Sequence, residues 1–301
     1  MDRKKALWLV SFPKSGNTWT VEIIRKAAAR AGFSAGEDYD IYNLIGQSRP
    51  FVPTSFIAPA FADEACFLLK THSAFDPDSQ PHADLGFVTE GFIHIYRNPL
   101  DVLLSYINFT RIEYYSHQND AVYQRELFLD LLGLPSVPSY AAWNALSLDT
   151  LPRENLDHAL SQFMKSELAI PSLTAMSSSW IKHTQSWIEA ANRGTPSAVL
   201  KYEECLVNPS VFNRMDRFFS FGPSVMSDAV QEANEFLKKK SATSSKELKS
   251  EGHTNIPEEA IFFNKMTSCY YINYFSRPLL SSFMSEYGQV LREFGYIDLP
   301  Y

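Results

Sequence analysis

A group of polar residues near the start of the chain could bind an anion. Lys14, Ser15, Asn17 and Thr18 surround Gly16 and supply one cation and several side-chain hydrogen-bond donors. If a helix begins here, its first backbone N–H groups are unpaired and carry partial positive charge, which suits a phosphate-sized group. The loop is not a Walker A motif, because its Lys precedes the Gly instead of following it. The residues alone leave an ordinary strand-to-helix turn as the alternative.

Two further reactive side chains, Lys70 and His72, directly follow the apolar run 66–69. A run of this length is typical of a buried strand. Ligands of open α/β sheets bind outside the carboxyl ends of the strands, so His72 stands where chemistry would occur. A histidine there could act as a general base, and a lysine could neutralise developing charge. Taken by position alone, a purely structural His72 is the alternative.

Arg97 and Ser105 could bind a second anion. Arg97 follows the apolar run 92–96, and Ser105 comes eight residues later in a helix that is predicted to begin at Pro99. A guanidinium group offers a forked pair of donors that matches phosphate, and the serine adds a hydroxyl. The alternative is a surface ion pair between Arg97 and Asp101.

A parallel sheet whose strands end at one edge would bring these side chains together. Short apolar runs predict strands near residues 7–11, 66–70, 92–96 and 198–202. Apolar residues at helical spacing follow the first run from Thr18, and Gly32 ends them. The sequence therefore predicts an α/β fold with a P-loop-like central parallel sheet of at least four strands, flanked by helices. We expect one domain over residues 1–301.

A helical insertion is expected over about residues 111–176. Residues 111–132 have a helical pattern, and the Gly and Pro residues of 133–138 break it. Long segments within compact domains tend to be functional, and the aromatic content argues against disorder. We interpret the insertion as a lid over an acceptor or as an extra structural layer of helices.

The composition narrows the class of protein. The formal net charge of −7 disfavours a broad nucleic-acid interface. Three widely spaced cysteines argue for a reducing compartment and against a disulfide framework or a zinc site. No stretch approaches the roughly 18 apolar residues of a membrane span. We predict a cytoplasmic protein that binds neither nucleic acid nor membrane.

The three groups of residues also match known motifs in a known order. The string Phe-Pro-Lys-Ser-Gly-Asn-Thr-Trp at 12–19 closely resembles the 5′-phosphosulfate loop of the cytosolic-type sulfotransferases. These enzymes use 3′-phosphoadenosine 5′-phosphosulfate (PAPS) as sulfuryl donor. Lys-Thr-His at 70–72 is similar to the family segment that carries the catalytic base, and Tyr-Arg-Asn-Pro-x-Asp at 96–101 is similar to the family's 3′-phosphate segment. By this resemblance the chain is identified as a bacterial-like, small-molecule member of the family over nearly its whole length.

The resemblance implies a role for each candidate residue. His72 would be the catalytic base, and Lys14 and Lys70 would stabilise the leaving group and the transferred group. The remaining donor-binding residues would be Ser15, Gly16, Asn17 and Thr18 at the 5′-phosphate, Trp19 and Tyr202 near the adenine, Arg97 and Ser105 at the 3′-phosphate, and Thr243, Ser244 and Lys265. No metal is required.

One helical segment resembles the family without an implied chemical role. Residues 180–188 predict an amphipathic helix that is similar to the family's Trp-x-x-His-x-x-x-Trp helix. Trp180 and Trp187 fall on one face of it, so we interpret the segment as structural.

The C-terminal part departs from the family pattern. Ser245 stands where the family has an aromatic residue that contacts adenine, and Asn264 stands where it has an arginine. Met266 and Cys269 replace two glycines, whereas Lys265 is retained as a cation. These departures predict a weakened clamp on the nucleotide.

The sequence thus predicts a sulfotransferase that moves the sulfuryl group of PAPS in line to a hydroxyl or amine of a small organic acceptor and releases 3′-phosphoadenosine 5′-phosphate (PAP). A natural product or a xenobiotic would suit a chain of this kind as acceptor. One alternative is a P-loop nucleotide kinase, which the order of Lys and Gly disfavours. Another is a degenerate PAPS-binding module without activity. A homodimer is left open, because the Lys-x-x-x-Thr-Val type of dimer segment is not found.

Overall fold

The computed structural model describes residues 4–32, 42–43, 66–75, 87–116, 120–173, 177–242 and 268–296. The chain divides into two units. The first comprises Met1–Arg97 with Ala175–Leu237, and the second comprises Asn98–Thr174 with Lys238–Tyr301. The single domain expected from the sequence stays a prediction.

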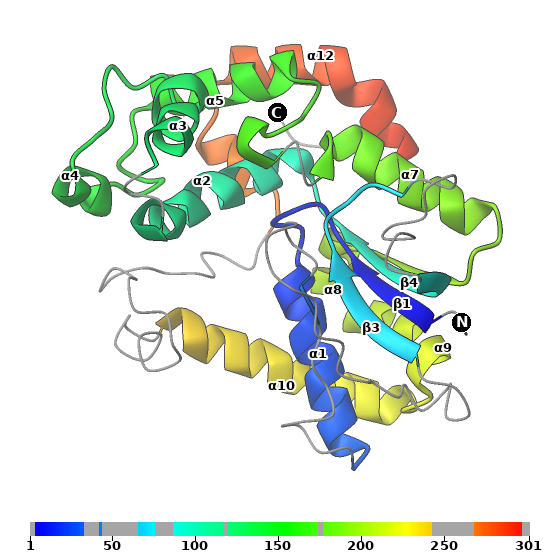
Figure 1. The fold of residues 1–301 in the computed structure, drawn as a ribbon. Coiled ribbons are helices and arrows are strands. Elements are labelled where there is room, and N and C mark those ends of the chain that lie inside the picture. Colours follow the sequence, from blue (N-terminus) through cyan, green and yellow to red (C-terminus); the bar gives the residue numbers. More distant parts are fainter. Residues whose placement is uncertain are drawn as a thin grey trace. The chain divides into compact units, whose positions relative to one another are not determined.

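The first unit is built on a five-stranded parallel sheet (Figure 1). Its strands are β1 (Lys4–Val10), β2 (Tyr42–Asn43), β3 (Cys66–Thr71), β4 (Phe87–Tyr96) and β5 (Ser197–Lys201), in the order β2-β3-β1-β4-β5. The prediction of a parallel sheet from four apolar runs is confirmed. β2 was not predicted, because a strand of two residues carries no periodic pattern.

The register of the sheet brings the candidate segments to one edge. Val10, near the end of β1, lies beside Thr71 of β3 and beside His94 of β4, and Tyr96 lies beside Lys201 of β5. All these strands are parallel, so the loops that follow them leave from the same edge of the sheet. The central position of β1 gives its loop a neighbour on either side.

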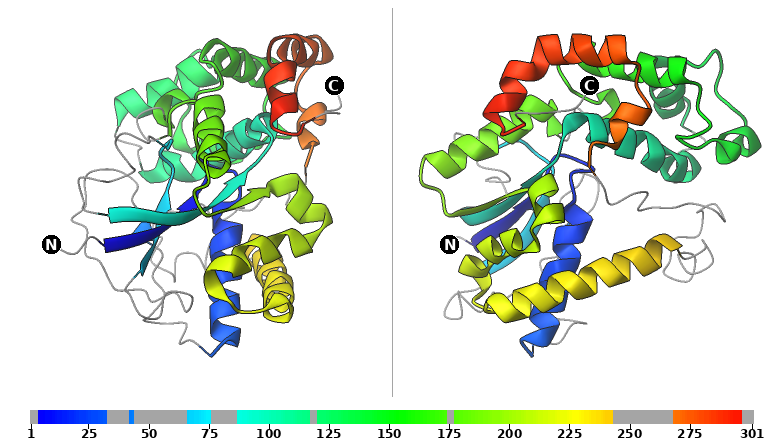
Figure 2. Two further views of the ribbon diagram at one scale, coloured as in Figure 1. Left: turned by 90° about the vertical axis from the view of Figure 1, so that its right-hand side faces the viewer. Right: turned by 180° about the vertical axis from the view of Figure 1, so that it is seen from behind.

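Helices cover both faces of this sheet. They are α1 (Asn17–Arg30), α7 (Trp180–Asn192), α8 (Tyr202–Val207), η5 (Pro209–Met215), α9 (Asp216–Phe219) and α10 (Pro223–Ala242), which ends beyond the first unit. Figures 1 and 2 show α7 on one face, with α1 and α10 on the other. Arg30 of α1 forms ion pairs with Asp228 and Glu232 of α10.

The core beneath α7 is a cluster of fully or almost fully buried residues from the sheet and the helix. It consists of Ala6, Trp8, Val10, Leu69, Phe92, Trp187 and Ala190. Alternate residues of β1 belong to this cluster, as expected when successive side chains of a strand point to opposite faces. Leu7 and Leu9, which alternate with them, are also buried, so β1 is covered on both sides.

The fourth predicted strand ends one residue earlier than expected. It was predicted over 198–202, but β5 ends at Lys201 and Tyr202 begins α8. Glu203 and Glu204 occupy the first turn of this helix. Their negative charges favour a helix N-terminus at this point.

The second unit is helical. Its elements are α2 (Pro99–Ser116), α3 (Ala121–Gln124), η3 (Arg125–Leu131), α4 (Tyr140–Ala145), α5 (Arg153–Lys165), η4 (Pro171–Leu173), η6 (Tyr270–Asn273) and α12 (Arg277–Glu293). The helix predicted over 111–132 is not continuous. Its first part belongs to α2, and a new helix begins after Asp120, whose side chain accepts a hydrogen bond from the Tyr123 amide at 3.0 Å. This cap starts a separate helix where the periodic pattern predicted one long element.

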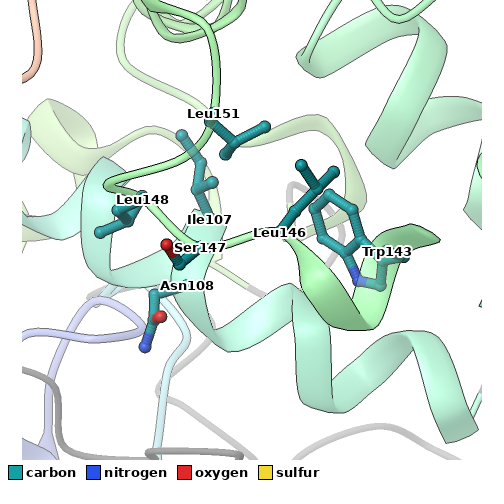
Figure 3. Close-up of a pocket in the computed structure, with 7 residues that line it drawn as sticks. All are labelled: Ile107, Asn108, Trp143, Leu146, Ser147, Leu148 and Leu151. Atoms are coloured by element: carbon teal, nitrogen blue, oxygen red, sulfur yellow. The ribbon is translucent and has the colours of Figure 1, made fainter. Parts of the chain in front are cut away.

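A small apolar pocket lies within the second unit. It is lined by Ile107, Asn108, Trp143, Leu146, Ser147, Leu148 and Leu151 (Figure 3). It has essentially no room for a water-sized molecule, so it is far smaller than ordinary ligand pockets of roughly 300–1,000 Å³. Within the described ranges, no helix is both long and apolar enough to cross a membrane.

Candidate functional site

The loop between β1 and α1 has a backbone shape that few residues adopt. Lys14 has φ of 70° and Gly16 has φ of 114°, both in the left-handed region. A Cβ atom at Gly16 would lie 2.8 Å from Cδ2 of Tyr202 and 3.0 Å from Cδ1 of Ile95. Both the conformation and the space therefore require glycine at this position.

This turn leaves the N-terminus of α1 uncapped. Asn17 is the first residue of the helix, and Gly16, at the cap position, has no side chain to accept a hydrogen bond from it. The first N–H groups of a helix have no partner within the helix and carry partial positive charge. The loop and α1 together form an anion cradle, here defined as residues 14–19.

Polar side-chain atoms are buried in the anion cradle without protein partners. The Ser15 hydroxyl, both polar atoms of the Asn17 amide and Nε1 of Trp19 have no hydrogen-bond partner among the described residues. Ser15 is fully buried, and Asn17 is 6% exposed. Unsatisfied buried polar groups are costly, so an anion that accepts from these donors would fit the cradle. Thr18, by contrast, is exposed.

His72 is held in one tautomer at the end of β3. Its Nδ1 atom lies 2.6 Å from the carbonyl oxygen of Ser11. A carbonyl only accepts hydrogen bonds, so Nδ1 carries the proton and donates it. In the neutral ring, Nε2 then keeps the lone pair that a general base needs.

The charge state of His72 follows from its surroundings. Burial, the positive charge of Lys70 and that of Lys14 lower the pKa of His72 to about 3, although the bond to Ser11 opposes them. Burial also lowers the pKa of Lys70 itself. His72 is therefore neutral at neutral pH, and the three predicted catalytic residues are close enough to interact electrostatically.

Two more histidines lie near His72, and no chemical role was predicted for either of them. His94 of β4 and His183 of α7 are fully buried, and their ring centroids are 5.7 Å apart. Phe12 meets the His183 ring edge-on at 5.8 Å. None of the four ring nitrogens has a hydrogen-bond partner in the part of the chain that the structure describes. We call His72, His94 and His183 the histidine group.

Burial keeps the inner members of the histidine group neutral. It lowers the pKa of His94 to about 3. Burial, followed by the charges that His94 and His72 would carry, lowers the pKa of His183 well below its usual range. The position of His94 two residues after Phe92 on β4 was a signal that its side chain points to the face of the sheet under α7.

Arg97 lies against the aromatic residues behind the anion cradle. Its guanidinium carbon is 4.3 Å from the centroid of the Tyr202 ring. Trp19 meets Tyr202 edge-on at 5.4 Å and Phe212 at 4.9 Å. The structure thus brings together Arg97, Tyr202 and Trp19, which the sequence predicted to bind the two ends of one nucleotide.

The remaining predicted donor-binding residues lie in the second unit or outside the described residues. Ser105 lies in α2 of the second unit, so its pairing with Arg97 stays a prediction. Thr243, Ser244 and Lys265 lie outside the described residues, as do the departures at 245, 264 and 266.

Cys269 can be described, and its backbone explains why a glycine suits its position. Its φ of 58° lies in the left-handed region. Its amide donates to Oδ2 of Asp101 at 2.7 Å, and the Tyr271 amide donates to Oδ1 of Asp101 at 3.3 Å. Asp101 is fully buried, so this carboxylate is not a surface group.

Chemically, the first unit offers an anion cradle, two lysines and a neutral histidine at the carboxyl edge of a parallel sheet. Such a site can bind a phosphate-type group and can accept a proton near it. The described ranges contain no group of three or more His, Cys, Asp or Glu residues that could hold a metal ion.

Comparisons with known proteins identify the family. The model of the sulfotransferase domain family matches residues 4–295, so the chain belongs to this family. This confirms the family and the enzyme class predicted from the sequence, a sulfotransferase.

The fold has a counterpart among solved structures. It is similar to the crystal structure of mouse sulfotransferase SULT7A1 complexed with PAP, with a TM-score of 0.50 and 18% sequence identity. The match covers 97% of this chain and 85% of the mouse chain. A search of curated proteins gives no match.

Proposed function

We propose that the chain transfers the sulfuryl group of PAPS to a hydroxyl or amine of a small organic acceptor and releases PAP. Membership of the sulfotransferase family supports the transfer. The observation that carries the proposal is the neutral His72 ring, with its proton on Nδ1, under the influence of Lys70 and Lys14 at the anion cradle. The PAP complex of the similar mouse enzyme supports the choice of donor.

The buried donors of the anion cradle fit the 5′-phosphosulfate end of PAPS. The backbone N–H groups of residues 15–18 and the side chains of Ser15 and Asn17 would hold its phosphate. Arg97 and Ser105 would hold the 3′-phosphate, helped by Lys265, and Trp19, Tyr202, Thr243 and Ser244 would lie near the adenine. When bound, PAPS supplies an activated sulfuryl group with PAP as its leaving group.

The chain's own residues would do three things for the transfer. His72 would take the acceptor proton at Nε2, a contribution of roughly 10²- to 10⁴-fold for a positioned base. Lys14, Lys70 and the helix N–H groups would neutralise charge on the leaving phosphate and on the transferred group. The cradle would hold both reactants in line, which lowers the entropic part of the barrier.

The low pKa of His72 couples its strength as a base to donor binding. Burial is the largest cause of this low pKa, and the charges of Lys70 and Lys14 lower it further. An anion bound beside the two lysines would offset their charge and raise the pKa toward its usual value. His72 would then be a stronger base when the donor is in place than when it is absent.

The acceptor is proposed only by class. A small organic alcohol, phenol or amine follows from the chemistry, and a natural product or xenobiotic remains our proposal. The small pocket in the second unit has no room for an acceptor molecule, so it does not indicate a particular acceptor. A cytoplasmic location stays a prediction.

Calorimetric titration with PAP beside ATP tests this function. We expect the chain to bind PAP in the micromolar range and ATP much more weakly. Arg97→Ala should abolish PAP binding, whereas Arg193→Ala, a matched control at an exposed ion pair with Glu189, should not. His72→Ala should retain PAP binding and lose the release of PAP from PAPS in the presence of a panel of phenols and amines. A wild-type chain that does not bind PAP, or binds ATP equally well, would refute the proposal.

A further inference from the structure

Helix α7 is tied to two of the segments that carry the proposed site. Trp187 donates from Nε1 to the carbonyl oxygen of Ser73 at 2.9 Å, directly after His72. Trp180 donates from Nε1 to the carbonyl oxygen of Arg97, also at 2.9 Å. Both tryptophans are fully buried. One face of α7 therefore bonds to the backbone beside His72, the proposed base, and to the backbone of Arg97, the residue proposed to bind the 3′-phosphate.

A second bond and close packing strengthen the tie at His72. The Phe75 amide donates to Oγ of Ser186 at 2.9 Å. The Trp187 ring also packs at 5.0 Å against Phe75 and at 4.9 Å against Phe92 of β4. The segment 73–75 thus accepts one hydrogen bond from α7, donates another to it and makes a ring contact with it, so its path depends on that helix.

The loop that leads from β1 into the anion cradle also contacts α7. Between the two tryptophans, the His183 ring contacts Phe12, which lies two residues before Lys14. Trp180 and Trp187 are seven residues apart, which is close to two helical turns, so they share one face. The helix starts in a fixed place, because the Ser179 side chain accepts a hydrogen bond from the Lys182 amide at 3.2 Å.

We propose that α7 is a positioning helix for the sulfuryl transfer, in which Trp187 sets the place of His72 and Trp180 sets the place of Arg97. This inference rests on the proposed function and goes beyond the structural role that the sequence suggested for the helix. Neither tryptophan is a catalytic residue. Each acts through a backbone carbonyl that it fixes.

If α7 positions the two residues separately, its two tryptophans should affect His72 and nucleotide binding independently. If α7 is merely structural, each substitution should affect both. Loss of the Trp187 bond should disturb the base and leave the nucleotide in place. Loss of the Trp180 bond should weaken nucleotide binding and leave the base in place. Trp8 provides the matched control, because it is fully buried in the same core cluster as Trp187 but donates from Nε1 to Oγ1 of Thr89 at 2.9 Å, so its replacement disturbs that core without removing either of the two bonds to the site backbone.

The test compares Trp187→Phe, Trp180→Phe and Trp8→Phe in the full chain. Calorimetry measures the dissociation constant of PAP, and ¹⁵N NMR of the histidine rings reports the tautomer and pKa of His72 without any ligand. We expect Trp187→Phe to shift the His72 ring signals and to change the PAP dissociation constant by less than about twofold, because it removes one hydrogen bond beside the base only. Trp180→Phe should raise the PAP dissociation constant by about 3- to 10-fold, the range for one lost hydrogen bond, and leave the His72 signals in place.

Trp8→Phe should change neither readout. The inference is overturned if Trp187→Phe leaves the His72 signals unmoved, or if all three variants change both readouts alike. If Trp187→Phe does not fold, Ser186→Ala removes the acceptor of the Phe75 amide and should shift the same His72 signals. A wild-type chain that does not bind PAP refutes the proposed function, and the ligand-free signals of His72 still decide the role of Trp187.

Discussion

Replacing Gly16 by Ala adds one methyl group to the turn between β1 and α1, and two separate costs follow. The backbone there has φ of 114°, which costs an L-residue with a Cβ about 1–2 kcal/mol. The new Cβ would also lie 2.8 Å from Cδ2 of Tyr202 and 3.0 Å from Cδ1 of Ile95. Overpacking of a filled core costs about 1–3 kcal/mol more. We expect the free energy of unfolding of Gly16→Ala to fall by about 2–5 kcal/mol in total.

Gly194→Ala is the matched control for this prediction. Gly194 has φ of 97°, but a Cβ there would meet nothing within 4 Å. It carries the same kind of backbone strain without the clash, and the effect of Gly-to-Ala replacement on the unfolded chain is common to both variants. The difference between the two variants therefore isolates the contact with Tyr202 and Ile95, which we expect to be about 1–3 kcal/mol.

The same clash should reach the proposed nucleotide site. The displaced Tyr202 ring lies against Arg97 at 4.3 Å and against Trp19 at 5.4 Å. We expect Gly16→Ala to weaken PAP binding by at least about tenfold, equivalent to about 1.4 kcal/mol, and Gly194→Ala to leave it unchanged. Urea unfolding and PAP calorimetry measure the two effects. Equal stability of the two variants, with PAP binding intact in Gly16→Ala, would refute the reasoning.

Two further predictions concern buried polar groups. The histidine group has lowered pKa values in the folded chain, so the unfolded chain binds more protons at acid pH and stability falls as pH drops through about 6.5. Between pH 7 and pH 5, His94 alone should lower the free energy of unfolding by about 2 kcal/mol. In urea unfolding, the stability of His94→Phe should therefore depend less steeply on pH than that of the wild type. An unchanged pH dependence would contradict the view that His94 is buried as a neutral ring. Asp101→Asn leaves the Cys269 amide opposite a neutral side chain and should lower the free energy of unfolding by about 1.5–3 kcal/mol, measured by thermal or urea unfolding. Asp149→Asn, at an exposed residue, should lower it by less. Equal losses in the two variants would contradict the importance of the buried carboxylate.

Most of the sheet could be predicted from the sequence because its strands are covered on both faces. Leu7 and Leu9 are buried as fully as Trp8 and Val10, so the apolar run is continuous and easily recognised. The start of a new helix after Asp120 was harder to predict, because a local cap at Asp120 outweighs a periodic pattern that continues past it.

The placement of candidate side chains was predictable where a side chain follows a strand end along the chain. His72 and Arg97 were predicted in this way, and they directly follow β3 and β4, whereas their roles stay predictions. His94 and His183 were not predicted, because their partnership depends on which residues of β4 and α7 face each other in the folded chain. The partners of Asp101 lie 168 and 170 residues away in sequence, and no local pattern indicates such a contact.

β1 lies between β3 and β4 in the sheet, and these two strands lead into different parts of the proposed site. The proposed base His72 follows β3, which itself carries Lys70, whereas the proposed nucleotide anchor Arg97 follows β4. Substitutions after β3 can therefore alter the chemistry while the nucleotide anchor persists. In a lineage that lost its base, this arrangement would leave a protein that still holds the nucleotide and could be recruited as a sensor of it.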